Sequence, residues 1–78
     1  MHAVLLIRCL PTKEQTVAKA IKEVSDKVKQ VMIVFGEYDV VAILEGDDTE
    51  TIGKEVTSKI RKIEGVIKTT TLMSISEL

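Results

Sequence analysis

Apolar and polar positions along the chain fall into four short apolar runs and two stretches with helical spacing. Residues 2–10 are apolar except at Arg8 and are followed by Pro11, which cannot donate a ladder hydrogen bond, so this run predicts a central strand. Three later runs rich in β-branched residues predict further strands at 28–35, 40–44 and 66–75.

The first helical stretch covers residues 13–24. Thr12 stands where an N-cap is expected, and Gln15 three positions later completes the pattern of a capping box. The apolar residues of this stretch recur at helical spacing, at Val17, Ala20, Ile21 and Val24.

The second helical stretch follows the loop 45–50, in which Asp47 or Asp48 is predicted as the N-cap. Gly65 is predicted to end this helix in a left-handed conformation. The apolar face of the helix consists of Ile52, Val56, Ile60 and Ile63.

The resulting order is β-α-β-β-α-β, with the second and third strands paired as an antiparallel hairpin. Two β-α-β halves with right-handed crossovers predict an α+β fold of the ferredoxin-like split β-α-β type, in which a four-stranded antiparallel sheet carries both helices on one face. The 78 residues form one small domain that buries only about 60% of its unfolded surface.

The first strand is apolar on both of its sides. Val4 and Leu6 alternate with Leu5 and Ile7. The third strand shows the same pattern, since the apolar residues Val41 and Ile43 alternate with the equally apolar Val40, Ala42 and Leu44. Helices on one face would leave the other face as an exposed apolar patch. The sequence therefore predicts a domain that dimerises through its sheet.

Charge and composition narrow the function classes. The formal net charge is −1, which disfavours direct nucleic-acid binding, and no apolar run is long enough to span a membrane. The single cysteine, Cys9, lies in an apolar run, which favours a packed thiol in a reducing, cytoplasmic compartment. The basic residues Lys59, Arg61 and Lys62 fit a solvated helix end better than a binding patch.

Catalytic constellations are missing from the sequence. His2 is the only histidine and has no second ligand at metal-binding spacing, and no phosphate-binding glycine motif occurs. We therefore expect no enzyme activity, no metal and no cofactor.

The tetrapeptide Gly36-Glu37-Tyr38-Asp39 joins the two hairpin strands. It fits a solvated turn, but its carboxylates would also accept hydrogen bonds from an ammonium group, and its glycine would let a ligand approach the backbone closely. Thr69 and Thr71 share one face of the last strand, where their hydroxyl groups suit either a sheet or a polar ligand.

Taken together, the opening strand ending at Pro11, the G-[DE]-[YF]-D hairpin at 36–39, the sequence IRKIEGV at 60–66 and the T-x-T strand resemble the effector-binding domain of Lrp/AsnC (feast/famine) transcription regulators, also called the RAM domain. The resemblance covers nearly the whole sequence. It implies sheet-mediated dimers that assemble into larger rings, and amino-acid effectors bound between subunits.

Carried over from that family, the ligand-binding residues would be the hairpin and two strand hydroxyls: Gly36, Glu37, Tyr38, Asp39, Thr69 and Thr71. The family's regulators also carry a helix-turn-helix for DNA, which this sequence does not contain. The resemblance is therefore to stand-alone RAM domains, which regulate transcription or metabolism through partners.

Two other functions remain open at this point. In the first alternative, the chain is a ligand-independent oligomerisation module that pairs with full-length Lrp-like regulators. A small dimeric α+β-barrel enzyme of the monooxygenase type shares the strand order, but its interior requires acid and base side chains where this chain has aliphatic ones.

Overall fold

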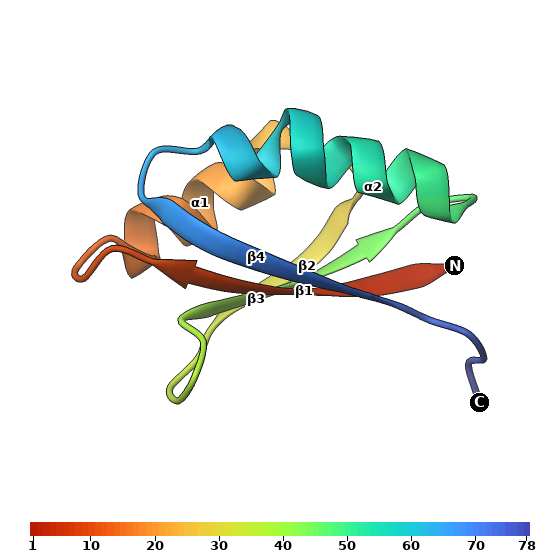
Figure 1. Ribbon diagram of the computed structural model, residues 1–78, viewed down its shortest axis with the longest axis horizontal. Coiled ribbons are helices and arrows are strands. Elements are labelled where there is room, and N and C mark those ends of the chain that lie inside the picture. The colour runs from red at the N-terminus through yellow and green to blue at the C-terminus, as the bar shows by residue number, and fades with distance from the viewer.

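The computed structural model describes all 78 residues. The elements in chain order are β1 His2–Cys9, α1 Glu14–Val24, β2 Val28–Ile33, β3 Val40–Glu45, α2 Thr49–Ser58, the 3-10 helix η1 Ile60–Lys62 and β4 Val66–Met73. The four strands form one antiparallel sheet in the order β2-β3-β1-β4, and both helices cover the same face (Figure 1). The predicted ferredoxin-like split β-α-β fold is confirmed.

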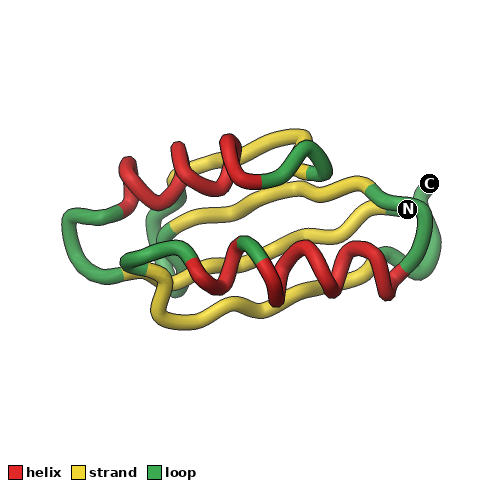
Figure 2. Tube along the Cα trace, turned by 90° about the horizontal axis from the view of Figure 1, so that it is seen from above, coloured by secondary structure: helices red, strands yellow, loops and turns green.

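A single hydrophobic core lies between the helices and the sheet, and Figure 2 shows both helices running over the strands. Neither helix is long and apolar enough to cross a membrane. The largest fully buried side chains are those of Leu5, Ile7, Val17, Ile21, Val40, Leu44, Ile52 and Ile60.

The side of the sheet without helices is also apolar. Val4 and Leu6 of β1 are half-buried, and their neighbours across the sheet continue the same surface. We call this surface the open face; its apolar members are Val4, Leu6, Met32, Val41, Ile43 and Leu72. The predicted second apolar face is therefore present.

The start of α1 differs from the prediction. Thr12 has φ 71° and makes no cap, and the helix begins at Glu14 after an N-cap residue, Lys13, that has no side-chain cap hydrogen bond. Lys13 donates its backbone N–H to the Leu10 carbonyl at 3.1 Å, so Pro11 and Thr12 occupy the centre of a tight turn. Because proline followed by a positive φ is the type II pattern, the turn takes Thr12 away from the capping position.

The start of α2 is as predicted for one of the two candidate caps. Asp48 accepts a hydrogen bond from the Thr51 backbone N–H at 2.7 Å, and this bond lowers the pKa of the Asp48 carboxyl. The helix ends earlier than predicted, at Ser58, and continues as η1. Gly65 has the predicted left-handed conformation, with φ 101°, but it follows η1 instead of ending α2.

Two strands are shorter than their apolar runs. β2 ends at Ile33 and β4 at Met73, although the runs continue to Phe35 and Ile75. Phe35 and Ile75 are both fully exposed. Neither side chain therefore contributes to the hydrophobic core or to the sheet of this chain.

Candidate functional site

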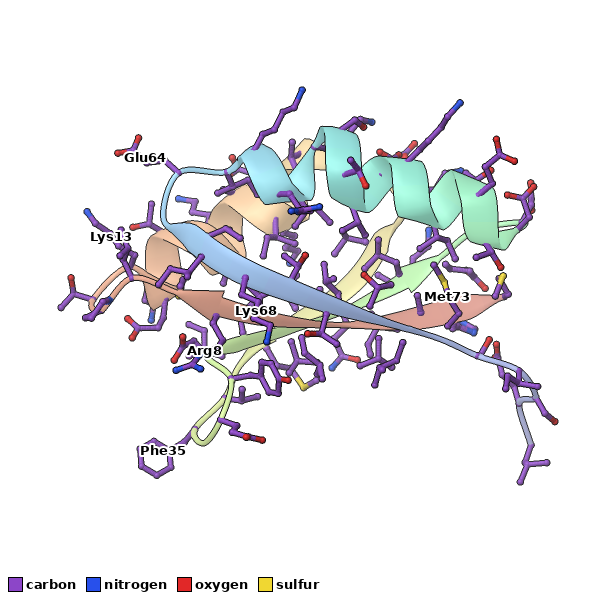
Figure 3. All side chains as sticks on the ribbon, viewed as in Figure 1. Arg8, Lys13, Phe35, Glu64, Lys68 and Met73 are labelled. Atoms are coloured by element: carbon purple, nitrogen blue, oxygen red, sulfur yellow. The ribbon has the colours of Figure 1, made fainter.

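The hairpin that carries Gly36 to Asp39 projects from the sheet on the side of the open face (Figure 1). Its base is closed by a 2.9 Å hydrogen bond from the Val34 N–H to the Asp39 carbonyl. Gly36 has φ 143°, and a Cβ at this position would meet no atom within 4 Å, so the turn requires glycine for its backbone angle and not for space. Phe35 lies at the far end of the projection (Figure 3).

Asp39 links the hairpin to the centre of the sheet. Its backbone N–H donates to the Ile7 carbonyl, and its carboxylate Oδ2 accepts from the Cys9 N–H, both at 2.9 Å. The side chain thus continues the β1–β3 ladder one step beyond the last backbone pair. One carboxylate oxygen is fixed by this bond, and the other has no partner within the protein.

Thr69 and Thr71 lie on β4, opposite Ile7 and Leu5 of β1. Because these partners are buried, the two threonines lie on the helix-covered side of the sheet, where both are half-buried. Ile7 of β1 has Asp39 on the β3 side and Thr69 on the β4 side, so the two residues are separated by the width of β1. The six predicted ligand residues therefore do not line one common cavity within the chain.

A cavity of about 610 Å³ opens at the carboxyl end of β1, and its size is within the range of small-molecule sites. Of the six predicted residues, only Asp39 lines it. The other lining residues come from β1, the turn after it, α1 and β4, namely Arg8, Cys9, Pro11, Glu14, Ile67 and Lys68.

The two cations of this cavity were missed by the sequence reasoning. Arg8 was seen only as an interruption of an apolar strand, whereas the register of β1 and β4 sets it directly opposite Lys68. A lone charged residue in a central strand was the available signal for Arg8. No signal along the chain connects it to a lysine sixty positions away.

Cys9 behaves as predicted for a packed thiol. It is buried, with 6% exposure, and has no disulfide partner. Burial raises the pKa of the Cys9 thiol, and the neighbouring carboxylates of Asp39 and Glu14 raise this pKa further. The thiol is therefore held in its neutral form beside the cavity.

Two other groups of polar side chains lie outside this cavity, one around His2 and one of basic residues near the end of α2. The His2 ring lies between the carboxylates of Glu45 and Glu77, and the latter also accepts from the Ser74 hydroxyl at 2.9 Å. The structure contains no group of three or more His, Cys, Asp or Glu side chains arranged to hold a metal ion. The basic residues Lys59, Arg61 and Lys62 are exposed, as the solvated-face interpretation predicts.

Comparison with known proteins places this geometry in a family context. The model of the GYD domain family matches residues 2–77. PF0250 of Pyrococcus furiosus, named an uncharacterised HTH-type transcriptional regulator, is 36% identical over an alignment of 75 residues, and the match covers 92% of this chain and 49% of that protein. The chain thus spans about half the length of this curated relative.

Solved structures show the same fold. TTHA0845 from Thermus thermophilus is 35% identical with a TM-score of 0.92, and the match covers 99% of this chain and 95% of that one. AsnC of E. coli is 20% identical with a TM-score of 0.85, covering 97% of this chain and 51% of AsnC. The transcriptional regulator NMB0573 of Neisseria meningitidis, solved in complex with L-Met, is 15% identical with a TM-score of 0.77, covering 97% and 52%. The predicted resemblance to Lrp/AsnC regulators therefore holds for the fold.

Proposed function

Since this chain belongs to the GYD domain family and is homologous to part of an HTH-type transcriptional regulator, we propose that it is a regulatory domain that senses a small amino acid. In this proposal, two copies associate through their open faces and bind the effector between subunits. Occupancy then changes the assembly, and partner proteins respond to that change. A cytoplasmic location completes the proposal.

The open face is the observation that carries this proposal. The longest and shortest dimensions of the molecule, 34 Å and 17 Å, limit the sheet face to roughly 600 Å², so two copies would bury at most about 1,200 Å². This is the lower end of a standard specific interface. The hairpin and the C-terminal tail both extend beyond the sheet on this side (Figure 1), so they would flank a second sheet stacked on the first.

An inter-subunit effector site also accounts for the dispersion of the predicted ligand residues. The carboxylate and backbone of the hairpin and the hydroxyls of Thr69 and Thr71 offer complementary partners for the ammonium and carboxylate of an amino acid. Within one subunit they lie on different sides of the sheet. Because the two threonines lie on the helix-covered side, further dimers assembled into a ring would be needed to bring the hairpin of one subunit to the strand of another. The L-Met complex of NMB0573, which shares only the fold, supports the choice of ligand class.

The test combines native mass spectrometry with calorimetry. We expect dimers or multiples of dimers, whose distribution changes when amino acids are added, because an effector shifts assembly only through its different affinity for two states. Titration with each of the twenty amino acids should give heat for one or a few. Folded protein that gives no heat with any of the twenty would contradict the proposal.

Asp39 provides the matched variant. Asp39→Asn keeps an oxygen that accepts from the Cys9 N–H and removes the charge, so it should weaken amino-acid binding more than it lowers the melting temperature. Asp39→Ala also removes the ladder hydrogen bond, whose loss costs about 1 kcal/mol. Asp47→Asn, at an exposed loop position, is the control and should change neither quantity.

A second candidate function rests on the relationship to half of PF0250. If this chain's open face matches that of a full-length regulator, the two would form mixed assemblies without any ligand. Co-purification of a regulator from cell extract in amino-acid-free buffer would support this function. An unchanged assembly upon addition of every amino acid would favour it over sensing.

A further inference from the structure

Arg8 and Lys68 form an unusual pair on the open side of the sheet. They are direct cross-strand partners on β1 and β4, and two like charges in this position destabilise a sheet. Neither residue takes part in an ion pair, although Lys59 and Glu55 form one elsewhere at 2.9 Å. The two cations therefore repel each other, and no carboxylate forms an ion pair with either of them.

The local backbone geometry maintains this arrangement. The β1–β4 register shifts between Arg8 and Cys9, because Arg8 pairs with Lys68 while Cys9 pairs with Val66, which leaves Ile67 as the extra residue of a bulge. A bulge redirects the side chains next to it and is common beside binding sites. Figure 3 shows the side chains of Arg8 and Lys68 both extending from the side of the sheet opposite the helices.

Carboxylates line the rest of the same cavity. Asp39 and Glu14 line it together with the two cations, so the four formal charges of the lining cancel. The Asp39 carboxylate is held in place through one oxygen by the Cys9 N–H, which leaves the other oxygen for a ligand. Positive and negative groups thus line one cavity of about 610 Å³.

We propose that this cavity selects an amino acid with an acidic side chain, with Arg8 and Lys68 binding the side-chain carboxylate. The inference rests on the proposed amino-acid-sensing function, shares Asp39 with the proposed inter-subunit site, and adds the class of effector. The guanidinium of Arg8 offers paired N–H donors that match a carboxylate, and the Lys68 ammonium adds a second charge. The ammonium of the ligand donates a hydrogen bond to the free oxygen of Asp39. A bound carboxylate also removes the repulsion between the two cations.

The experiment is isothermal titration of the intact protein with L-glutamate, L-glutamine and glutarate, supported by the same series with L-aspartate and L-asparagine. Glutamine is nearly isosteric with glutamate but lacks the side-chain charge, and glutarate lacks the ammonium. We expect glutamate to bind at least about tenfold more tightly than glutamine, the discrimination expected for one charge-assisted contact in an open site. Glutarate should bind more weakly than glutamate.

Two variants separate this role from a structural one. Arg8→Gln and Lys68→Gln should each lower glutamate affinity at least about tenfold and leave glutamine affinity unchanged. Because each substitution removes a like-charge repulsion, neither should lower the melting temperature. Lys62→Gln, at an exposed position of η1, is the control and should bind glutamate as the parent protein does.

Each outcome is decisive. If glutamine binds as tightly as glutamate, or if the two variants keep their preference for glutamate, the acidic-effector inference is wrong while amino-acid sensing stands. If glutarate binds as tightly as glutamate and no amino acid is preferred, the cation pair binds carboxylates but the amino-acid function is wrong. Absence of binding by all three ligands overturns the acidic-effector inference, whereas the sensing proposal falls only if none of the twenty amino acids gives heat.

Discussion

The two sides of β1 have nearly the same amino-acid composition and opposite surroundings. Leu5 is completely buried beneath the helices, whereas the adjacent Leu6 lies half-buried on the open face. The helices lie on one side because both crossover connections have the same hand. A strand that is apolar on both sides therefore indicates that both of its faces are covered. The topology decides which of the two faces is covered by helices of the same chain.

The largest expected effect comes from truncating the covered side. Leu5→Ala should lower the free energy of unfolding by about 2–5 kcal/mol, because it leaves a cavity in a packed core. Leu6→Ala removes the same atoms from the open face and should cost less than half as much in dilute solution. Urea denaturation at micromolar concentration and after tenfold dilution measures both. Equal losses for the two variants in dilute protein would contradict the distinction between the faces.

A charge on the open face should have the next largest effect. Ile43→Lys introduces an ammonium at the centre of the proposed interface and should convert dimers into monomers, with the far-ultraviolet circular dichroism unchanged. Thr57→Lys, on the exposed side of α2, is the matched control. Light scattering during gel filtration reports the mass. A wild-type protein that is monomeric at micromolar concentration would refute association through this face.

Two glycines sharpen the contrast on the helical side. Gly65→Ala should destabilise the fold by about 1–2 kcal/mol, since φ is 101° and the new Cβ would lie 3.1 Å from Val17 Cγ2. Gly53→Ala, within α2 and with open space around its Cβ, should stabilise by about 0.5–1 kcal/mol. Thermal unfolding of both variants gives the comparison. A neutral Gly65→Ala would mean that α1 adjusts more freely than the core geometry indicates.

The smallest effect concerns the tail at the far end of the open face. Hydrogen bonds from Ser74 and His2 lower the pKa of the Glu77 carboxyl below its ordinary value of 4.5. A carboxyl with a lowered folded-state pKa stabilises the protein above the unfolded value, and this contribution is lost as the pH falls through the folded value. Glu77→Gln should therefore weaken the fall in melting temperature below pH 4.5 without abolishing it. An identical pH profile for both proteins would show that the tail contacts do not stabilise the fold.

Much of the fold follows from local chemistry. The hydrophobic periodicity, Asp48 as one of the two predicted caps and the left-handed conformation of Gly65 were predicted correctly, because each depends on a few neighbouring residues. Thr12 was assigned wrongly because two local rules compete there, and the turn set by Pro11 outweighs the cap. The ends of β2 and β4 were placed too late, because β-propensity continues after pairing stops.

The candidate site was less accessible from the sequence. The hairpin tetrapeptide was recognisable as a motif, yet its assignment to a ligand remains a proposal, and Asp39 also has a role in the sheet that no local pattern revealed. The cavity at the end of β1 is lined by residues from the first, middle and last thirds of the sequence. Its cation pair depends on the β1–β4 register and on one bulge.

By itself, the sequence determined the elements, their order and the presence of two apolar sheet faces, because these follow from side-chain periodicity and from the backbone preferences of single residues. Only the tertiary structure decided which face the helices cover, that the Asp39 side chain continues a ladder, and that Arg8 meets Lys68. Strand register is the reason, because a shift of one residue turns every side chain to the other face, and the register is fixed by pairing across the whole sheet.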